Sequence, residues 1–201
     1  MNIFDFPADQ IGRLNDADLR ELVARLCEAE RELQEGFRTE VLWGGAQTAP
    51  DGGLDIVVRA VTSFSPTPVL PRRIAGIQVK RGSMGPAEIT REMRPNGTIR
   101  PAIAELAENS GAYLIVSAGD DCSLDMVRRR EAAMRTASEE LSAAASLHVA
   151  FVDRTMLARW LSTHPSPALW ARERIGLPIL TGWCPHGRWS STPATASDDL
   201  I

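Results

Sequence analysis

The stretch from Trp43 to Lys80 decides the fold that we expect for this chain. It opens with Trp43-Gly-Gly-Ala-Gln47, turns through Asp51-Gly-Gly-Leu-Asp55, continues as an apolar run and ends in Ile77-Gln-Val-Lys80. Paired glycines signal a tight turn, and β-branched runs favour strands. We therefore expect two strands, one that begins at Asp55 and one that ends at Lys80.

These strands present an acid, an amide and an amine. A carboxylate inside an apolar run is costly unless it is paired or bound to a metal, which singles out Asp55. Gln78 and Lys80 are two residues apart, so the alternation of a strand puts both on one face. Carboxylate and amide oxygens suit Mg²⁺, and a lysine can hold positive charge beside a reacting phosphate. The pattern indicates metal-assisted phosphodiester hydrolysis, although each part alone is common in turns and at solvated strand ends.

The order Asp51-Gly-Gly-Leu-Asp55 followed by Gln78-Val-Lys-Arg81 resembles the Mrr-like branch of the PD-(D/E)xK restriction-endonuclease superfamily. The Trp43-Gly-Gly-Ala-Gln47 opening and Glu92-Met-Arg-Pro95 are also similar to the amino-terminal nuclease domain of bacterial antiphage STAND NTPases of the Avs type. The resemblance implies a restriction-endonuclease-like α/β sandwich with a mixed central sheet flanked by helices. It also implies that Asp55, Gln78 and the Val79 backbone carbonyl bind Mg²⁺ or Mn²⁺, and that Lys80 orients or activates water.

A helix is expected from the capping residues at 15–18 to Gly36, with an apolar stripe that includes Leu19, Leu22 and Leu26. The resemblance implies that a glutamate from this helix joins the metal. Glu30 lies near the centre of the stripe and Glu21 almost opposite it, which favours Glu30. The position of the family's Phe-Glu pair favours Glu21, so we choose Glu30 and keep Glu21 as the alternative.

The net charge of −4 means that DNA binding would need a local basic patch. The arginines just downstream of the second strand are the best candidates for phosphate contacts, with solvated loop arginines as the alternative reading: Arg81, Arg91, Arg94 and Arg100. Three cysteines without metal-ligand spacing predict reduced thiols. The lack of an apolar run near ~20 residues and of a signal-peptide pattern predicts a cytoplasmic protein with no membrane partner.

Helices and strands alternate through the second half of the chain, which predicts a nuclease domain over residues 1–163. The helix after Ser123 is expected to turn Leu124 and Met134 inward and the arginines at 128–130 outward. A composition shift then predicts a Trp/Pro-rich extension over 164–189 and a linker or tail over 190–201.

The leading hypothesis is a Mg²⁺-dependent endodeoxyribonuclease that cuts double-stranded DNA. By resemblance it would be the effector domain of a longer antiphage protein, joined to NTPase and sensor domains and active as a homo-oligomer. The alternative is a catalytically silent nuclease-fold module for binding or oligomerisation, because Gln78 replaces an acid and lowers the negative charge of the site. A free-standing methylation-dependent restriction enzyme would need a DNA-reading domain that the sequence does not show.

Overall fold

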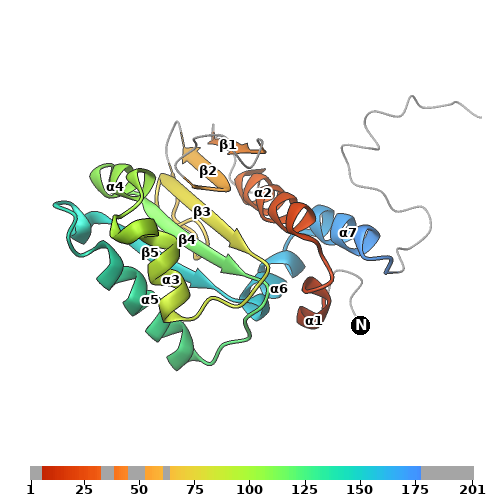
Figure 1. Ribbon diagram of the computed structural model, residues 1–201. Helices are drawn as coiled ribbons and strands as arrows, with labels where there is room; N and C mark the ends of the chain where they lie inside the picture. Colours follow the sequence, from red (N-terminus) through yellow and green to blue (C-terminus); the bar gives the residue numbers. More distant parts are fainter. Residues whose placement is uncertain (1–5, 33–38, 45–52, 61–63, 178–201) are drawn as a thin grey trace, which may run out of the picture.

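A five-stranded mixed sheet forms the centre of the computed structural model, which describes residues 6–32, 39–44, 53–60 and 64–177 (Figure 1). The strands are β1 (Thr39–Trp43), β2 (Ile56–Ala60), β3 (Ile74–Lys80), β4 (Ala112–Ser117) and β5 (His148–Val152). They lie side by side in chain order, with β1, β2 and β3 antiparallel and β3, β4 and β5 parallel. The expected α/β class with a mixed sheet between helices is confirmed.

Two layers of helices bury the two faces of the sheet (Figure 1). The helices of the first layer are α2 (Asp16–Glu32), α6 (Arg154–Ser162) and α7 (Pro165–Arg174). Those of the second layer are α3 (Pro86–Met93), α4 (Pro101–Glu108) and α5 (Leu124–Ser138). The short elements are α1 (Ala8–Ile11), η1 (Pro95–Gly97) and η2 (Ala144–Ser146). Among the described residues, no helix is long and apolar enough to cross a membrane.

Strand β3 divides its side chains between these layers. Ala75, Ile77 and Val79 are buried in the cluster beneath α2, α6 and α7. Gln78 and Lys80 alternate with them and so point toward the layer of α3, α4 and α5, on one face as the sequence predicted. Gly76 shares that face, and a Cβ there would lie 2.7 Å from methyl groups of Leu54 and Leu106. The glycine therefore leaves room for two leucines to pack over the middle of β3.

β3 ends at Lys80 and α5 begins directly after Ser123, as the sequence predicted. Asp55 directly precedes β2 instead of lying in it. The chain turns sharply after α3, where Asn96 (φ 60°) and Gly97 (φ 80°) lie in the left-handed region. The predicted end of the first helix at Gly36 lies outside the described residues.

Helix α7 belongs to the packed domain. Its Ala168 and Ala171 are buried in the same cluster as α2 and α6. The packed core therefore continues beyond residue 163, where the sequence had placed the start of an extension. Residues 178–201, which include the expected tail, lie outside the described part.

Arg130 is buried, which corrects the expectation that it faces outward with Arg128 and Arg129. Its guanidinium is 2.6 Å from Asp120 and also donates to the Met84 carbonyl. Asp120 in turn accepts from the Met84 N–H and the Ser117 hydroxyl. This network fixes the loop that follows Lys80.

Helical spacing explains the Arg130 error. Arg130, Met134 and Ala137 follow one another at intervals of four and three residues and lie on one buried stripe of α5. Leu124 was also assigned wrongly: it is the first residue of the helix and its side chain is 66% exposed.

We expect Arg130→Met to lower the free energy of unfolding by about 3 kcal/mol or more, because it leaves the buried Asp120 carboxylate without its cation. Arg129→Met is the matched control, since this arginine is exposed and its one ion pair within the described part of the chain is with Asp125 on the same helix. It should change stability by less than about 0.5 kcal/mol. Urea denaturation of the three proteins measures the difference, and equal stabilities would contradict a structural role for Arg130.

Candidate active site

Asp55 joins the start of β2 to the end of β3. Its main-chain N–H donates to the Ile77 carbonyl (3.0 Å). Its Oδ2 accepts from the Val79 N–H (2.7 Å) and from Gln78 Nε2 (2.8 Å). The acid and the amide that the sequence singled out are thus in direct contact.

The second oxygen of Asp55 is less engaged. Oδ1 lies 3.8 Å from Arg20 Nη1, and the carboxylate side chain is 17% exposed. Burial raises the pKa of the Asp55 carboxyl, while the Val79 N–H, Arg20 and Lys80 act in the opposite direction. Asp55 Oδ1 is therefore the oxygen available to a further ligand.

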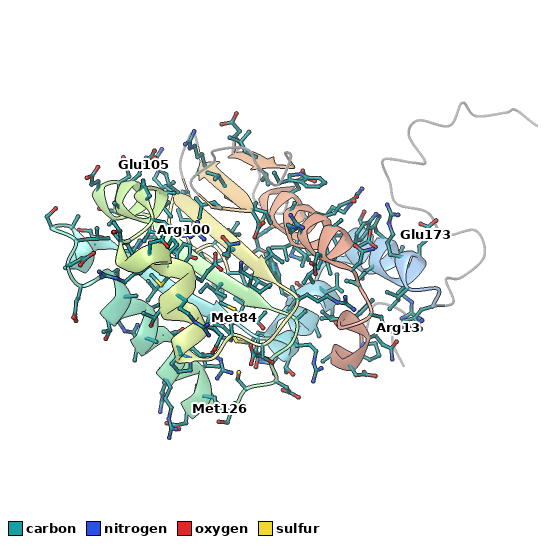
Figure 2. The ribbon with its side chains drawn as sticks, in the orientation of Figure 1. Arg13, Met84, Arg100, Glu105, Met126 and Glu173 are labelled. Atoms are coloured by element: carbon teal, nitrogen blue, oxygen red, sulfur yellow. The ribbon has the colours of Figure 1, made fainter. Side chains whose placement is uncertain are left out.

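Lys80 forms an ion pair with Glu92 of α3. Its Nζ lies 2.8 Å from Glu92 Oε2, and Arg100 Nη2 lies 2.9 Å from Glu92 Oε1. Arg100 Nε also donates to the Glu92 carbonyl (2.6 Å), which ties the start of α4 to the end of α3. Figure 2 labels this arginine beside these two helices. Glu92 therefore binds one cation with each oxygen.

Two buried polar atoms at this site have no hydrogen-bond partner within the described part of the chain: Gln78 Oε1 and the Tyr113 hydroxyl. Gln78 is only 7% exposed. Tyr113 lies on β4 opposite Gly76, and burial and the neighbouring Glu92 raise its pKa. An unpartnered buried polar atom costs about 1–3 kcal/mol, so these two atoms are suited to a ligand that supplies a partner.

The oxygens of this site fit a hard cation. Asp55 Oδ1 and Gln78 Oε1 are ligands of the kind that Mg²⁺ takes, and Mg²⁺ keeps several waters and needs few protein ligands. Because the N–H and C=O of one strand residue point the same way, the Val79 carbonyl lies on the Asp55 side of β3. Among the residues described, no three His, Cys, Asp or Glu side chains gather as a metal cluster. A cation here would depend on amide, main-chain, water and phosphate oxygens.

Glu30 has other partners. Its Oε2 accepts from Trp160 Nε1 (3.0 Å) and lies 2.8 Å from His164 Nε2, in the layer of α6 and α7. The hydrogen bond with His164 is the main reason why the pKa of Glu30 is lowered. Among the described residues, Glu30 therefore shares no partner with Asp55, and its predicted role at the metal gains no support from these contacts.

The contacts of Glu21 do not support a role at the metal either. It pairs with Arg25 at 2.8 Å and lies 4.0 Å from Arg174. The α2 side chain that contacts Asp55 is Arg20. The helix therefore brings a cation to the site, where the resemblance implied an acid.

The four arginines proposed for DNA contacts divide into two pairs. Arg94 donates to the Gly97 and Ala137 carbonyls and pairs with Glu140, and Arg100 is bound to Glu92. Arg91 is 74% exposed and, among the described residues, pairs with Glu88 alone, on its own helix. Arg81 is exposed and has no partner among the described residues. Arg81 and Arg91 are the two that are available to phosphate.

Three residues of this site had no predicted role there: Arg20, Glu92 and Tyr113. Glu92 flanks the apolar positions Ile89 and Met93 on α3, and an acid at the border of a buried stripe was a usable signal. Tyr113 lay in a run expected to be buried, where its hydroxyl needed a partner. Nothing local distinguished Arg20 from the other arginines.

No protein-family model matches the chain, and comparisons with curated proteins and with solved structures give no match. The surface hollow that the structure forms between residues 6–8 and α6 is lined by Thr155, Arg159 and Ser162 and holds no carboxylate. The Asp55 site is therefore the stronger candidate for chemistry.

We expect Glu30→Gln to lower the free energy of unfolding at neutral pH by about 2 kcal/mol, because hydrogen bonds to a charged carboxylate are lost. A carboxyl with a lowered folded-state pKa stabilises above its unfolded pKa, and this contribution disappears as the pH falls through the folded pKa. The gap between wild type and variant should therefore close in acid. Urea denaturation at several pH values measures it, with Glu105→Gln, an exposed glutamate, as the control. A gap that does not change with pH would contradict the assignment.

Proposed function

We propose that this chain is a metal-dependent DNA endonuclease of the PD-(D/E)xK type, with Asp55, Gln78 and Lys80 as its reacting residues. The observation that carries the proposal is the double contact of Asp55 Oδ2 with Gln78 and the Val79 N–H. This contact fixes an acid, an amide and the only lysine of the chain at one end of β3. The strand order, with three antiparallel strands and then a parallel crossover, resembles a restriction-endonuclease-like core.

Each residue has a distinct role in this proposal. Asp55 Oδ1, Gln78 Oε1 and the Val79 carbonyl would hold Mg²⁺, or Mn²⁺ in its place, which supplies Lewis-acid stabilisation of phosphoryl oxygens. Lys80 holds an ammonium beside the attacked phosphate, where negative charge develops. Burial keeps the field of these charges strong.

The substrate and the setting follow from charge and from the resemblance. Arg81 directly follows Lys80 and Arg91 lies on α3, so both can contact the phosphates that flank the cut. Double-stranded DNA is the proposed substrate, and a cytoplasmic antiphage protein with NTPase and sensor domains is the proposed setting. A net charge of −4 favours weak DNA binding by one copy, so clustering would supply affinity through avidity.

A second candidate is a nuclease-fold module without catalysis. Lys80 is engaged by Glu92, and Asp55 and Glu92 are outnumbered by Arg20, Lys80 and Arg100. A site with this balance also suits a binding role. In that case Lys80→Ala would leave the biological effect unchanged.

Plasmid cleavage tests the proposed function. Wild type should nick or linearise supercoiled DNA only with Mg²⁺ or Mn²⁺, and Lys80→Ala and Asp55→Ala should each lose at least about 100-fold in rate. Arg128→Ala, at an exposed position on α5, is the matched control and should cut like wild type. Folded wild-type protein that cuts nothing in any format would favour the second candidate.

Forced assembly tests the oligomer proposal. Fusion to a tetramerising helix should raise the cleavage rate at a fixed protomer concentration by about 100-fold, because the linked sites bind DNA together. The comparison is cleavage by the isolated chain and by the fusion, each with its Lys80→Ala variant. An unchanged rate would rule out activation by clustering.

A further inference from the structure

The contacts of Glu92 are unusual for a residue that only supports a fold. It is the one acid that contacts Lys80 among the described residues, and its side chain is 17% exposed. Its two oxygens hold different cations, Lys80 on Oε2 and Arg100 on Oε1. Arg100 Nε also donates a hydrogen bond to the Glu92 main-chain carbonyl. The Arg100 contact is therefore doubled, whereas the Lys80 contact is a single ion pair.

The balance of charges at the site favours a change of partner by Glu92 when a cation binds. Asp55 and Glu92 carry two negative charges, and Arg20, Lys80 and Arg100 carry three positive ones. A divalent cation bound to Asp55 and the neutral Gln78 alone would add two charges to this excess. Moving Glu92 Oε2 from Lys80 to the cation gives the cation a second carboxylate. It also frees the ammonium for a phosphate, which brings negative charge of its own.

Neighbouring groups support a ligand at this point. Glu92 is close enough to act electrostatically on both Asp55 and Tyr113. Gln78, which contacts Asp55 through its amide nitrogen, is 7% exposed, and its Oε1 has no hydrogen-bond partner in the part of the chain that the structure describes. Gln78 carries no charge, so a cation held by Asp55 and Gln78 would have one carboxylate, and Glu92 on α3 is a second acid at the site.

We propose that Glu92 is the second carboxylate of the metal site, and that its Oε2 exchanges the Lys80 ammonium for the cation while Arg100 keeps Oε1. This inference rests on the proposed metal-dependent function. In the metal-free protein the Lys80 ammonium would then be paired with Glu92, and it would become available to a phosphate once the cation binds.

Direct ligation is tested by Glu92→Cys with Co²⁺. A cysteine thiolate bound to Co²⁺ gives a charge-transfer absorption band, which needs no DNA and no catalysis. The band should appear in Glu92→Cys and disappear when Asp55→Ala is added. Glu88→Cys is the matched control, since Glu88 lies on the same helix, is 45% exposed and pairs with Arg91. It should give no band above that of the native cysteines.

Calorimetry with Mg²⁺ separates failure of this inference from failure of the proposed function. Glu92→Gln should weaken Mg²⁺ binding by about 10-fold or more, and Glu88→Gln should not. If Asp55-dependent Mg²⁺ binding persists while Glu92→Cys gives no band, Glu92 is not a ligand and the proposed function stands. If wild type binds neither metal, the inference and the proposed function both fail.

The release of Lys80 has its own readout. Because Lys80 is the only lysine, ¹³Cε-lysine labelling gives one side-chain NMR signal. Mg²⁺ should shift this signal in wild type. In Glu92→Gln the metal-free signal should already be displaced, and saturating Mg²⁺ should move it much less. A shift of equal size in both proteins would overturn the exchange.

Discussion

The Asp55 carboxylate is the constraint on which the rest of this structure depends. Its position is fixed by a main-chain donor, Val79 N–H, which belongs to a central strand and cannot move without the sheet. Gln78 then orients its amide nitrogen toward the same oxygen. Both contacts engage Oδ2, so Oδ1 is left facing the site with Arg20 at 3.8 Å. One carboxylate thus joins two strands through Oδ2, while Oδ1 has the more distant Arg20 as its neighbour.

The sheet and its loops support this arrangement from behind. β3 lies between an antiparallel and a parallel neighbour, so its register is set on both sides. The buried pair of Asp120 and Arg130 holds the loop that follows Lys80. A buried ion pair is weak evidence for stability, but here it fixes main-chain groups of Met84 in the loop after β3. The candidate site therefore lies on a central strand of the sheet, with Lys80 paired to Glu92 of α3.

Part of the candidate site could be predicted from the sequence. Strand alternation alone put Gln78 and Lys80 on one face, and a paired-glycine turn put Asp55 at the start of its strand. The choice of Glu30 failed to gain support for a physical reason. The helical wheel correctly put it on the inward stripe of α2, but that stripe covers the sheet face of Ala75, Ile77 and Val79. Gln78 and Lys80 face the opposite layer. A wheel gives the buried side of a helix and does not say which face of the sheet it covers.

The partners of the charged residues were equally out of reach of local patterns. The pairing of Lys80 with Glu92 and of Asp55 with Arg20 depends on how helices far apart in the chain pack on the sheet.

The most direct test of the proposed metal site is a crystal structure of the protein soaked in Mn²⁺, with anomalous scattering used to find the ion. We expect an anomalous peak for an ion that is coordinated by Asp55 Oδ1 and Gln78 Oε1. No peak there at saturating Mn²⁺, with Lys80 still bound to Glu92, would contradict it.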